Sequence, residues 1–223
     1  MIALMQASAA QGGDLIGHWD FNDISNGVLK DVSGHDHHGK IHGAPEIVKG
    51  VSGTALRFKT NDDYVDFGAP LVPENDFTIS IWLNCDTVDK QFFLGQYQYN
   101  HPNRLDLAIR EGAVRIQIDG IIDSKKIIEA NKWHNVVYAR KSGLTTIYVN
   151  GEAVKEAELK TAVIQSENLM LGKINVPDKP TFRFTGMLDE LRIFKNALSA
   201  GEIKTLYRNT VDAPLADSKR ERQ

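Results

Sequence analysis

The sequence predicts an all-β protein, built as a two-sheet antiparallel β-sandwich with one short C-terminal helix. From Leu15 onward, apolar and polar residues alternate with a period of two, and Gly, Asn, Asp or Pro interrupts the alternation roughly every 8–12 residues. Only one segment has a helical period, and nothing alternates strands with helices as a parallel sheet requires. The 223 residues fit a single domain, because many β-sandwiches reach this length as one unit.

The first strands are predicted from residues that share a face. Residues 105–109 and 114–118 alternate on either side of Glu111-Gly112, which predicts a hairpin. In the segment 76–84, one set of side chains should face the core and the other should face away from it. The core-facing set is Phe77, Ile79, Ile81 and Leu83, and the other set is Thr78, Ser80, Trp82 and Asn84.

The second half of the chain continues the meander and ends in the helix. Asn150-Gly151 is a pair that accepts positive φ angles, as a two-residue hairpin turn requires. Residues 199–202, Ser-Ala-Gly-Glu, form a capping box, and apolar residues follow it at helical spacing. We expect residues 14–209 to form the domain and residues 210–223 to be a frayed polar tail. The apolar helix positions are Ile203, Leu206 and Tyr207.

Residues 1–13 are set apart from the domain. They contain a short apolar stretch and the small-residue box Ala7-Ser8-Ala9, but no positively charged start. Two interpretations stay open: a remnant of an export signal, or a neutral leader. Neither bears on the fold.

Charge and composition exclude several classes of function. The 26 basic and 29 acidic side chains give a net charge of −3, so we expect no nucleic-acid partner. No apolar run approaches the roughly 18 residues that cross a bilayer, so we expect no membrane insertion. Cys85 is the single cysteine, which excludes an intramolecular disulfide and a cysteine-based zinc cluster.

Several short segments, taken in order, resemble a known family. They are residues 17–22, 31–34 with Gly39, 53–58 with 63–65, 77–82, 132–137, 147–151 and 186–194. Together they resemble the laminin-G-like, concanavalin A-like lectin/glucanase jelly-roll family of bacterial secreted proteins. The resemblance implies a curved sandwich in a secreted, periplasmic or cell-surface setting, which can be one domain of a longer protein. It also implies a structural calcium and a face that binds glycans or other polymers.

The calcium site carries over onto four positions. Calcium takes six to eight oxygen ligands, including carboxylates, amides and backbone carbonyls. The family pattern matches best at Asp20, Asn22, Gly39 and Asp189, and the histidine-rich loop before Gly39 departs from it. The alternative is that Asp20 and Asn22 are solvated and that Asp189 pairs with an arginine.

A saccharide site needs flat aromatic rings and polar groups that read hydroxyls. Trp82 is predicted on the face of its strand that points away from the core, and residues 96–104 form a polar, aromatic loop. We therefore expect ligand binding by Trp82, Tyr97, Tyr99 and Arg104. In the alternative, Trp82 packs under a loop and the tyrosines are ordinary surface residues.

Catalytic signatures are weak. Glycosidases need paired carboxylates, and Asp189-Glu190 would place its two on opposite faces of a strand. The sequence has no nucleophile elbow and no zinc-protease motif. We expect a non-catalytic module that binds a carbohydrate or surface polymer and holds calcium. A polysaccharide-degrading glycosidase or lyase on the same fold, or a protein-adhesion domain, stays open.

Overall fold

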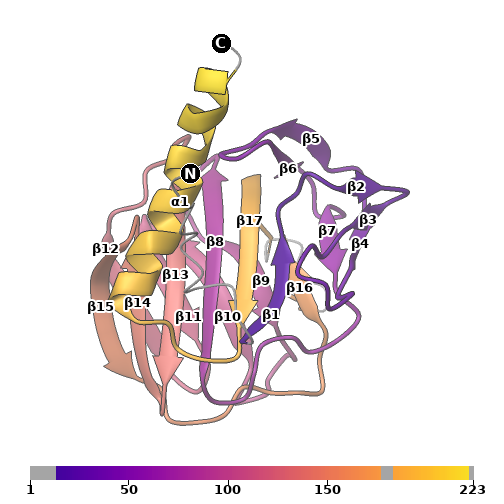
Figure 1. Ribbon diagram of the computed structural model, residues 1–223. Helices are drawn as coiled ribbons and strands as arrows, with labels where there is room; N and C mark the ends of the chain where they lie inside the picture. Colours follow the sequence, from indigo (N-terminus) through magenta and orange to yellow (C-terminus); the bar gives the residue numbers. More distant parts are fainter. Residues whose placement is uncertain (1–13, 177–182, 221–223) are drawn as a thin grey trace.

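The computed structural model describes residues 14–176 and 183–220, which form two antiparallel sheets packed face to face (Figure 1). Sheet A contains β1 (Leu15–Trp19), β5 (Glu46–Lys49), β6 (Thr54–Phe58), β8 (Phe77–Cys85), β13 (His134–Lys141), β14 (Leu144–Val149), β15 (Glu152–Glu158) and β17 (Gly186–Phe194). Its order is β15-β14-β13-β8-β17-β6-β5, and β1 also pairs with β17.

Sheet B contains β2 (Ile24–Ser25), β3 (Val28–Leu29), β4 (Gly39–His42), β7 (Tyr64–Asp66), β9 (Gln91–Gln96), β10 (Leu105–Arg110), β11 (Ala113–Gln117), β12 (Ile121–Lys126) and β16 (Leu169–Leu171). Its order is β12-β11-β10-β9-β16-β7-β4-β3-β2. The predicted all-β, two-sheet antiparallel sandwich is confirmed.

The core lies between the two sheets and follows the predicted alternation. The apolar set of β8 has no solvent-accessible surface, and Trp19 is equally buried. Burying one such side chain stabilises the fold by about 1.5–3 kcal/mol. The fully buried apolar residues of β8 are Phe77, Ile79, Ile81, Leu83 and Cys85. Burial also raises the pKa of the Cys85 thiol to about 11, so Cys85 packs and is not a nucleophile.

Tight turns set the register of the hairpins. Glu111 and Gly112 have φ angles of 50° and 80°, and Asn150 and Gly151 have 52° and 80°. Two consecutive positive φ angles define the turn whose twist matches that of the flanking strands. The predicted hairpins therefore form where the sequence places them.

Helix α1 (Ala200–Arg220) begins at the predicted capping box. The Ser199 amide donates to Glu202 Oε2 (2.7 Å), and the Glu202 amide donates to Ser199 Oγ (3.3 Å). Ile203 and Leu206 pack on the outer face of sheet A. The helix is longer than predicted, since it continues into the expected polar tail. Once a helix has formed, each further residue adds one backbone hydrogen bond.

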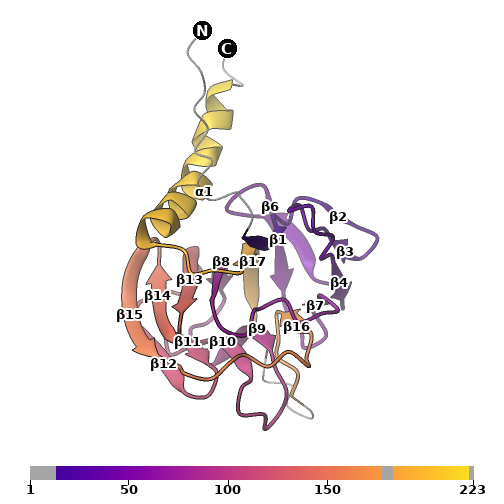
Figure 2. The same cartoon turned by 60° about the horizontal axis from the view of Figure 1, so that its bottom comes forward.

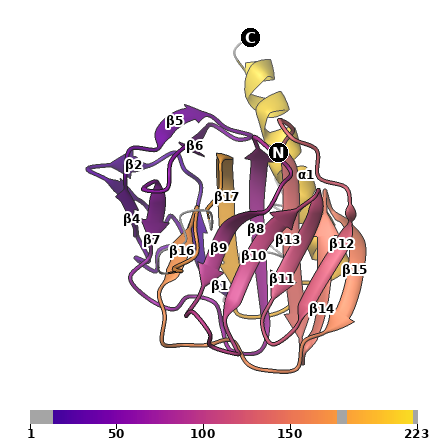
Figure 3. The same cartoon turned by 180° about the vertical axis from the view of Figure 1, so that it is seen from behind.

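The two outer faces differ in what covers them. Helix α1 crosses the outer face of sheet A and then extends past the sandwich (Figures 1 and 2). Seen from behind, the strands of sheet B face the viewer and α1 lies on the far side (Figure 3). Sheet B is therefore the sheet whose outer face α1 does not cover.

Candidate functional site

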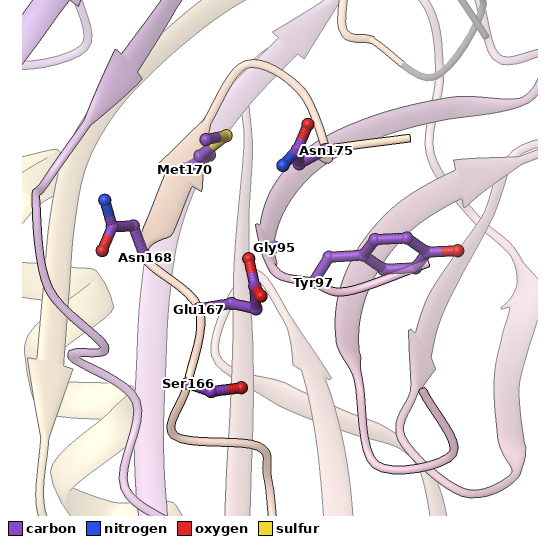
Figure 4. A pocket seen from close by; sticks show the side chains of 7 residues that line it. All are labelled: Gly95, Tyr97, Ser166, Glu167, Asn168, Met170 and Asn175. Atoms are coloured by element: carbon purple, nitrogen blue, oxygen red, sulfur yellow. The ribbon is translucent and has the colours of Figure 1, made fainter. Parts of the chain in front are cut away.

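A pocket of about 200 Å³ opens on the outer face of sheet B (Figure 4). Met170 of β16 pairs with Gly95 of β9, and both lie on the pocket floor. Gly95 interrupts an apolar strand, and its missing side chain lets Ile174 approach the backbone closely. The lining residues are Gly95, Tyr97, Ser166, Glu167, Asn168, Met170 and Asn175.

The wall of the pocket carries several hydrogen-bonding groups. Residues 166–168 supply a hydroxyl, a carboxyl and an amide, and Asn175 supplies a second amide. Glu167 extends its carboxyl group between Asn168 and Tyr97 (Figure 4). Asn168 Nδ2 donates to Asp66 Oδ1 (3.1 Å), which fixes the orientation of the amide. A few fixed polar groups beside an aromatic ring are typical of small-molecule sites.

Gln96 anchors the wall from inside the sandwich. Its side chain is fully buried, accepts from the Val72 amide (3.1 Å) through Oε1 and donates to the Ile164 carbonyl through Nε2. Gln165 Nε2 adds a hydrogen bond to the Val72 carbonyl (3.0 Å). These contacts hold the segment that leads into residues 166–168.

Arg140 of β13 fixes the start of the same segment. Its guanidinium is buried, and four backbone carbonyls accept its hydrogen bonds. The acceptors and distances are Glu74 (3.0 Å), Asn75 (2.5 Å), Leu159 (2.7 Å) and Thr161 (2.7 Å). Burial lowers the pKa of this guanidinium. Arg140 therefore ties the turn before β8 to the chain that enters the pocket wall.

Three of the four predicted ligand-binding residues lie together in the loop between β9 and β10. Tyr97 is 7% exposed and lines the pocket, whereas Tyr99 is 52% exposed. The Arg104 guanidinium carbon lies 5.5 Å from the centroid of the Tyr97 ring, a cation–π contact. Arg104 Nη1 also donates to the His101 carbonyl (2.9 Å).

Trp82 lies apart from the other three predicted ligand-binding residues. It does face away from the core, but it belongs to β8 of sheet A, is 4% exposed and stacks on Tyr207 of α1. The helix thus covers the ring, and Trp82 is separated from the loop that holds Tyr97. The alternative in which Trp82 packs is the one observed, with a helix in place of a loop.

The structure brings the predicted calcium ligands Asn22 and Asp189 to one short segment, residues 50–54. Asp189 Oδ2 accepts from the Val51 and Ser52 amides (2.9 and 3.2 Å), and Asn22 Oδ1 accepts from the Thr54 amide (2.8 Å). Asp189 is fully buried, and its Oδ1 has no hydrogen-bond partner. Burial is the main cause that raises the pKa of Asp189 to about 7.

The other two predicted calcium ligands are Asp20, which lies next to Asn22, and Gly39, which lies in the other sheet. Asp20 Oδ1 accepts a hydrogen bond from the backbone amide of Asn22 (3.0 Å). Gly39 belongs to β4 of sheet B, and its nearest side chains are Val65 and Phe67. Among the residues that the structure describes, no cluster of three or more His, Cys, Asp or Glu could hold a metal. A calcium ion beside Asp189 would therefore depend on amide and carbonyl oxygens as well.

Backbone strain marks the same region. Glu190 has φ 52° inside β17, at a bulge between Asp189 and Arg192. Its carboxyl accepts from Arg192 Nη2 (2.6 Å) and contacts His18 Nε2 (2.9 Å). Phe21 also has a positive φ, 59°. Non-glycine residues in this conformation cost about 1–3 kcal/mol each and concentrate at ligand sites.

The architecture and the open pocket define a two-sheet jelly-roll protein with a candidate binding site on one outer face. The chain belongs to the concanavalin A-like lectin/glucanase superfamily, whose family model matches residues 59–204. A comparison with curated protein sequences gives no match. No helix among the described residues has the length and apolar character to cross a bilayer.

Solved structures with the same fold include carbohydrate-binding domains. Domain 4 of AbnA, an extracellular GH43 arabinanase from Geobacillus stearothermophilus, in complex with arabinotriose, has a TM-score of 0.69 and 20% identity, covering 87% of this chain and 98% of that one. The binding domain of Paraclostridial Mosquitocidal Protein 1 has a TM-score of 0.69 and 17% identity, covering 88% and 52%.

The botulinum neurotoxin serotype D ligand binding domain, in complex with N-acetylneuraminic acid, has a TM-score of 0.65 and 16% identity, covering 88% of this chain and 51% of that one. The chain thus spans about half the length of the two toxin domains. At these identities the similarity establishes the fold.

Proposed function

We propose that this chain is a non-catalytic carbohydrate-binding module that holds its ligand at the Tyr97 pocket. The observation that carries the proposal is the combination of the Tyr97 ring with amide, hydroxyl and carboxyl groups in one pocket, where Asp66 holds the Asn168 amide. Sugars present apolar ring faces and many hydroxyls, so they match such a wall. The pocket volume is below the roughly 300–1,000 Å³ of sites that enclose drug-sized ligands, which suits one sugar unit of a longer glycan.

The structural neighbours support this proposal. Two of them are complexes with arabinotriose and N-acetylneuraminic acid, on the same fold. The arabinanase domain is also nearly the same size as this chain. Following these relatives, the module would act outside the cytoplasm, as a secreted, periplasmic or cell-surface protein, alone or joined to other domains.

A glycan-binding experiment tests the proposal. Calorimetry against a panel of neutral and acidic oligosaccharides, including arabinotriose and N-acetylneuraminic acid, should find a ligand, and Tyr97→Ala should weaken it at least about tenfold. Leu144→Ala is the control, because Leu144 is exposed on sheet A. Absence of binding across the panel would refute the carbohydrate role and favour protein adhesion. Reducing-end or unsaturated products would instead identify an enzyme.

We also propose a structural calcium beside Asp189, with Asn22 and Asp20 as further side-chain ligands. The partnerless, buried Oδ1 of Asp189 supports it, as do the strained neighbours Phe21 and Glu190. Bound calcium would supply positive charge that compensates the buried carboxylate. Asp189, Asn22 and the segment 50–54 would be held together, so the ion would stabilise the fold by linkage.

Melting curves test the calcium proposal. After verified metal removal, added Ca²⁺ should raise the Tm of the wild type, and Asp189→Asn should lose this increment. Asp36→Asn is the control, since the Asp36 side chain is 90% exposed. A Tm that does not respond to calcium would refute the proposal.

A further inference from the structure

Asp106 is a buried carboxyl group next to the pocket. It lies in β10 between two core residues, Leu105 and Leu107, so its side chain points to the outer face of sheet B. Its partner across the strand pair is Gly95, the glycine of the pocket floor. Asp106 is nevertheless only 2% exposed.

Ile174 packs over Gly95, the residue that pairs with Asp106, because Ile174 Cγ2 lies where a Cβ on Gly95 would point. Ile174 is part of a small apolar cluster on the outer face, with Phe92, Tyr97 and Ala108. The subsite proposed below requires that Ile174 moves aside when the ligand binds.

Two buried polar atoms at this position have no hydrogen-bond partner. They are Asp106 Oδ1 and Arg104 Nε, an acceptor and a donor. The two residues are two positions apart in the chain, and Arg104 is one of the charges that act on the Asp106 carboxyl group. More than nine in ten buried polar groups are paired in folded proteins, so an unpaired donor and an unpaired acceptor this close in the chain require an explanation.

We propose that Asp106 and Arg104 form a second subsite, which reads adjacent hydroxyls of a neutral sugar bound at the Tyr97 pocket. One hydroxyl donates its hydrogen to Asp106 Oδ1, and the hydroxyl next to it accepts from Arg104 Nε. The inference rests on the carbohydrate-binding function proposed above. It also specifies the ligand class. The charges of Arg104, Arg115 and Lys90 oppose that of Asp106, whereas the one charged side chain among the described residues that line the pocket is Glu167, which disfavours an acidic sugar by like-charge repulsion.

The test is calorimetry at pH 8 with arabinotriose, the other neutral oligosaccharides of the panel, and N-acetylneuraminic acid. Asp106→Asn should weaken neutral-glycan binding at least about tenfold, while Ile174→Ala should leave it unchanged or make it tighter. Asp123→Asn is the matched control, since Asp123 is a partly exposed carboxylate two strands away that pairs with Arg115. The affinity of Asp123→Asn for the neutral glycan should stay within about twofold of the wild-type affinity.

The Tm separates a ligand-reading role from a structural one. Because Asp106 Oδ1 is buried without a partner, Asp106→Asn should hold or raise the Tm at pH 8, whereas a structural role would lower it. Wild-type affinity in Asp106→Asn, with binding still lost in Tyr97→Ala, would overturn this subsite alone. Preference for N-acetylneuraminic acid would also overturn it. No binding by the wild type would overturn both the subsite and the carbohydrate function.

Discussion

The Trp82 indole of β8 stacks on the Tyr207 ring of α1, with ring centroids 5.5 Å apart and an angle of 16° between the planes. This contact joins the C-terminal helix to the centre of sheet A. It explains why the outer face of sheet A does not present Trp82 to a ligand, although a second pocket of about 270 Å³ lies on that face beside the start of α1. The helix is therefore part of the domain's packing.

Removing the ring of Tyr207 should destabilise the protein. Tyr207→Ala should lower the free energy of unfolding by about 1–3 kcal/mol, because an aromatic contact and its buried area are lost. Urea denaturation measures the change, and Tyr99→Ala, at an exposed position, should stay within about 0.5 kcal/mol. Glycan affinity should not change in Tyr207→Ala. A clear loss of affinity would mean that sheet A takes part in binding.

Removing the Arg140 guanidinium should lower the free energy of unfolding more than Tyr207→Ala does. Arg140→Met should lower the free energy of unfolding by about 3 kcal/mol or more, since four carbonyl oxygens lose their donor. Arg110→Met is the matched control, because Arg110 is exposed at the end of β10. Equal unfolding free energies for the two variants would contradict the anchoring role of Arg140.

Gln96 should influence glycan binding indirectly, because its side chain holds the segment that forms the pocket wall. Gln96→Leu keeps the side-chain volume but removes the hydrogen bonds to Val72 and Ile164, so residues 163–168 should become more mobile. Hydrogen exchange should rise in that segment, and glycan affinity should fall. Gln117→Leu on β11 should change neither. Faster exchange throughout the sandwich would show global destabilisation instead of a local effect.

Alternation in the sequence predicts which residues share a face, and it does so correctly for β8. It cannot say which element packs on that face, because this depends on where a distant segment folds back. Tyr207 was assigned to the apolar face of the helix, yet only the fold brings it to Trp82. The same reason explains why Trp82 lies apart from the loop that holds Tyr97, although the sequence grouped them in one site.

The pocket was predicted in part. Tyr97 and its loop were identified because polar and aromatic residues cluster there in the sequence. The wall at 166–168 was missed, since Ser-Glu-Asn between strands resembles any surface turn. Gly95 did carry a signal, because a glycine inside an apolar strand indicates a close approach or a hollow. Asp106 was missed because its burial depends on the fold: an acidic residue on the outer face of a strand is expected to be exposed, yet it is 2% exposed.

Asp106 should give the protein a specific pH dependence. Burial is the largest cause of its shift and raises its pKa to about 7, against the opposing charges of Arg104, Arg115 and Lys90. In the unfolded chain this carboxyl group has its ordinary pKa of 3.8, so the folded state binds more protons between pH 3.8 and pH 7. The resulting stability is fully present below about pH 3.8 and is lost as the pH rises through about 7.

Urea denaturation of the wild type and Asp106→Asn at pH 4.5 and pH 8 tests this sign. The wild type should lose on the order of 2–4 kcal/mol relative to the variant on going to pH 8. Arg115 and Tyr97 do not produce the change, because the pKa of each is raised above an ordinary value that already lies above this pH range. If the difference between the two proteins were the same at both pH values, Asp106 would be ionised in the fold, and the burial of an unpaired carboxyl group at this site would be wrong.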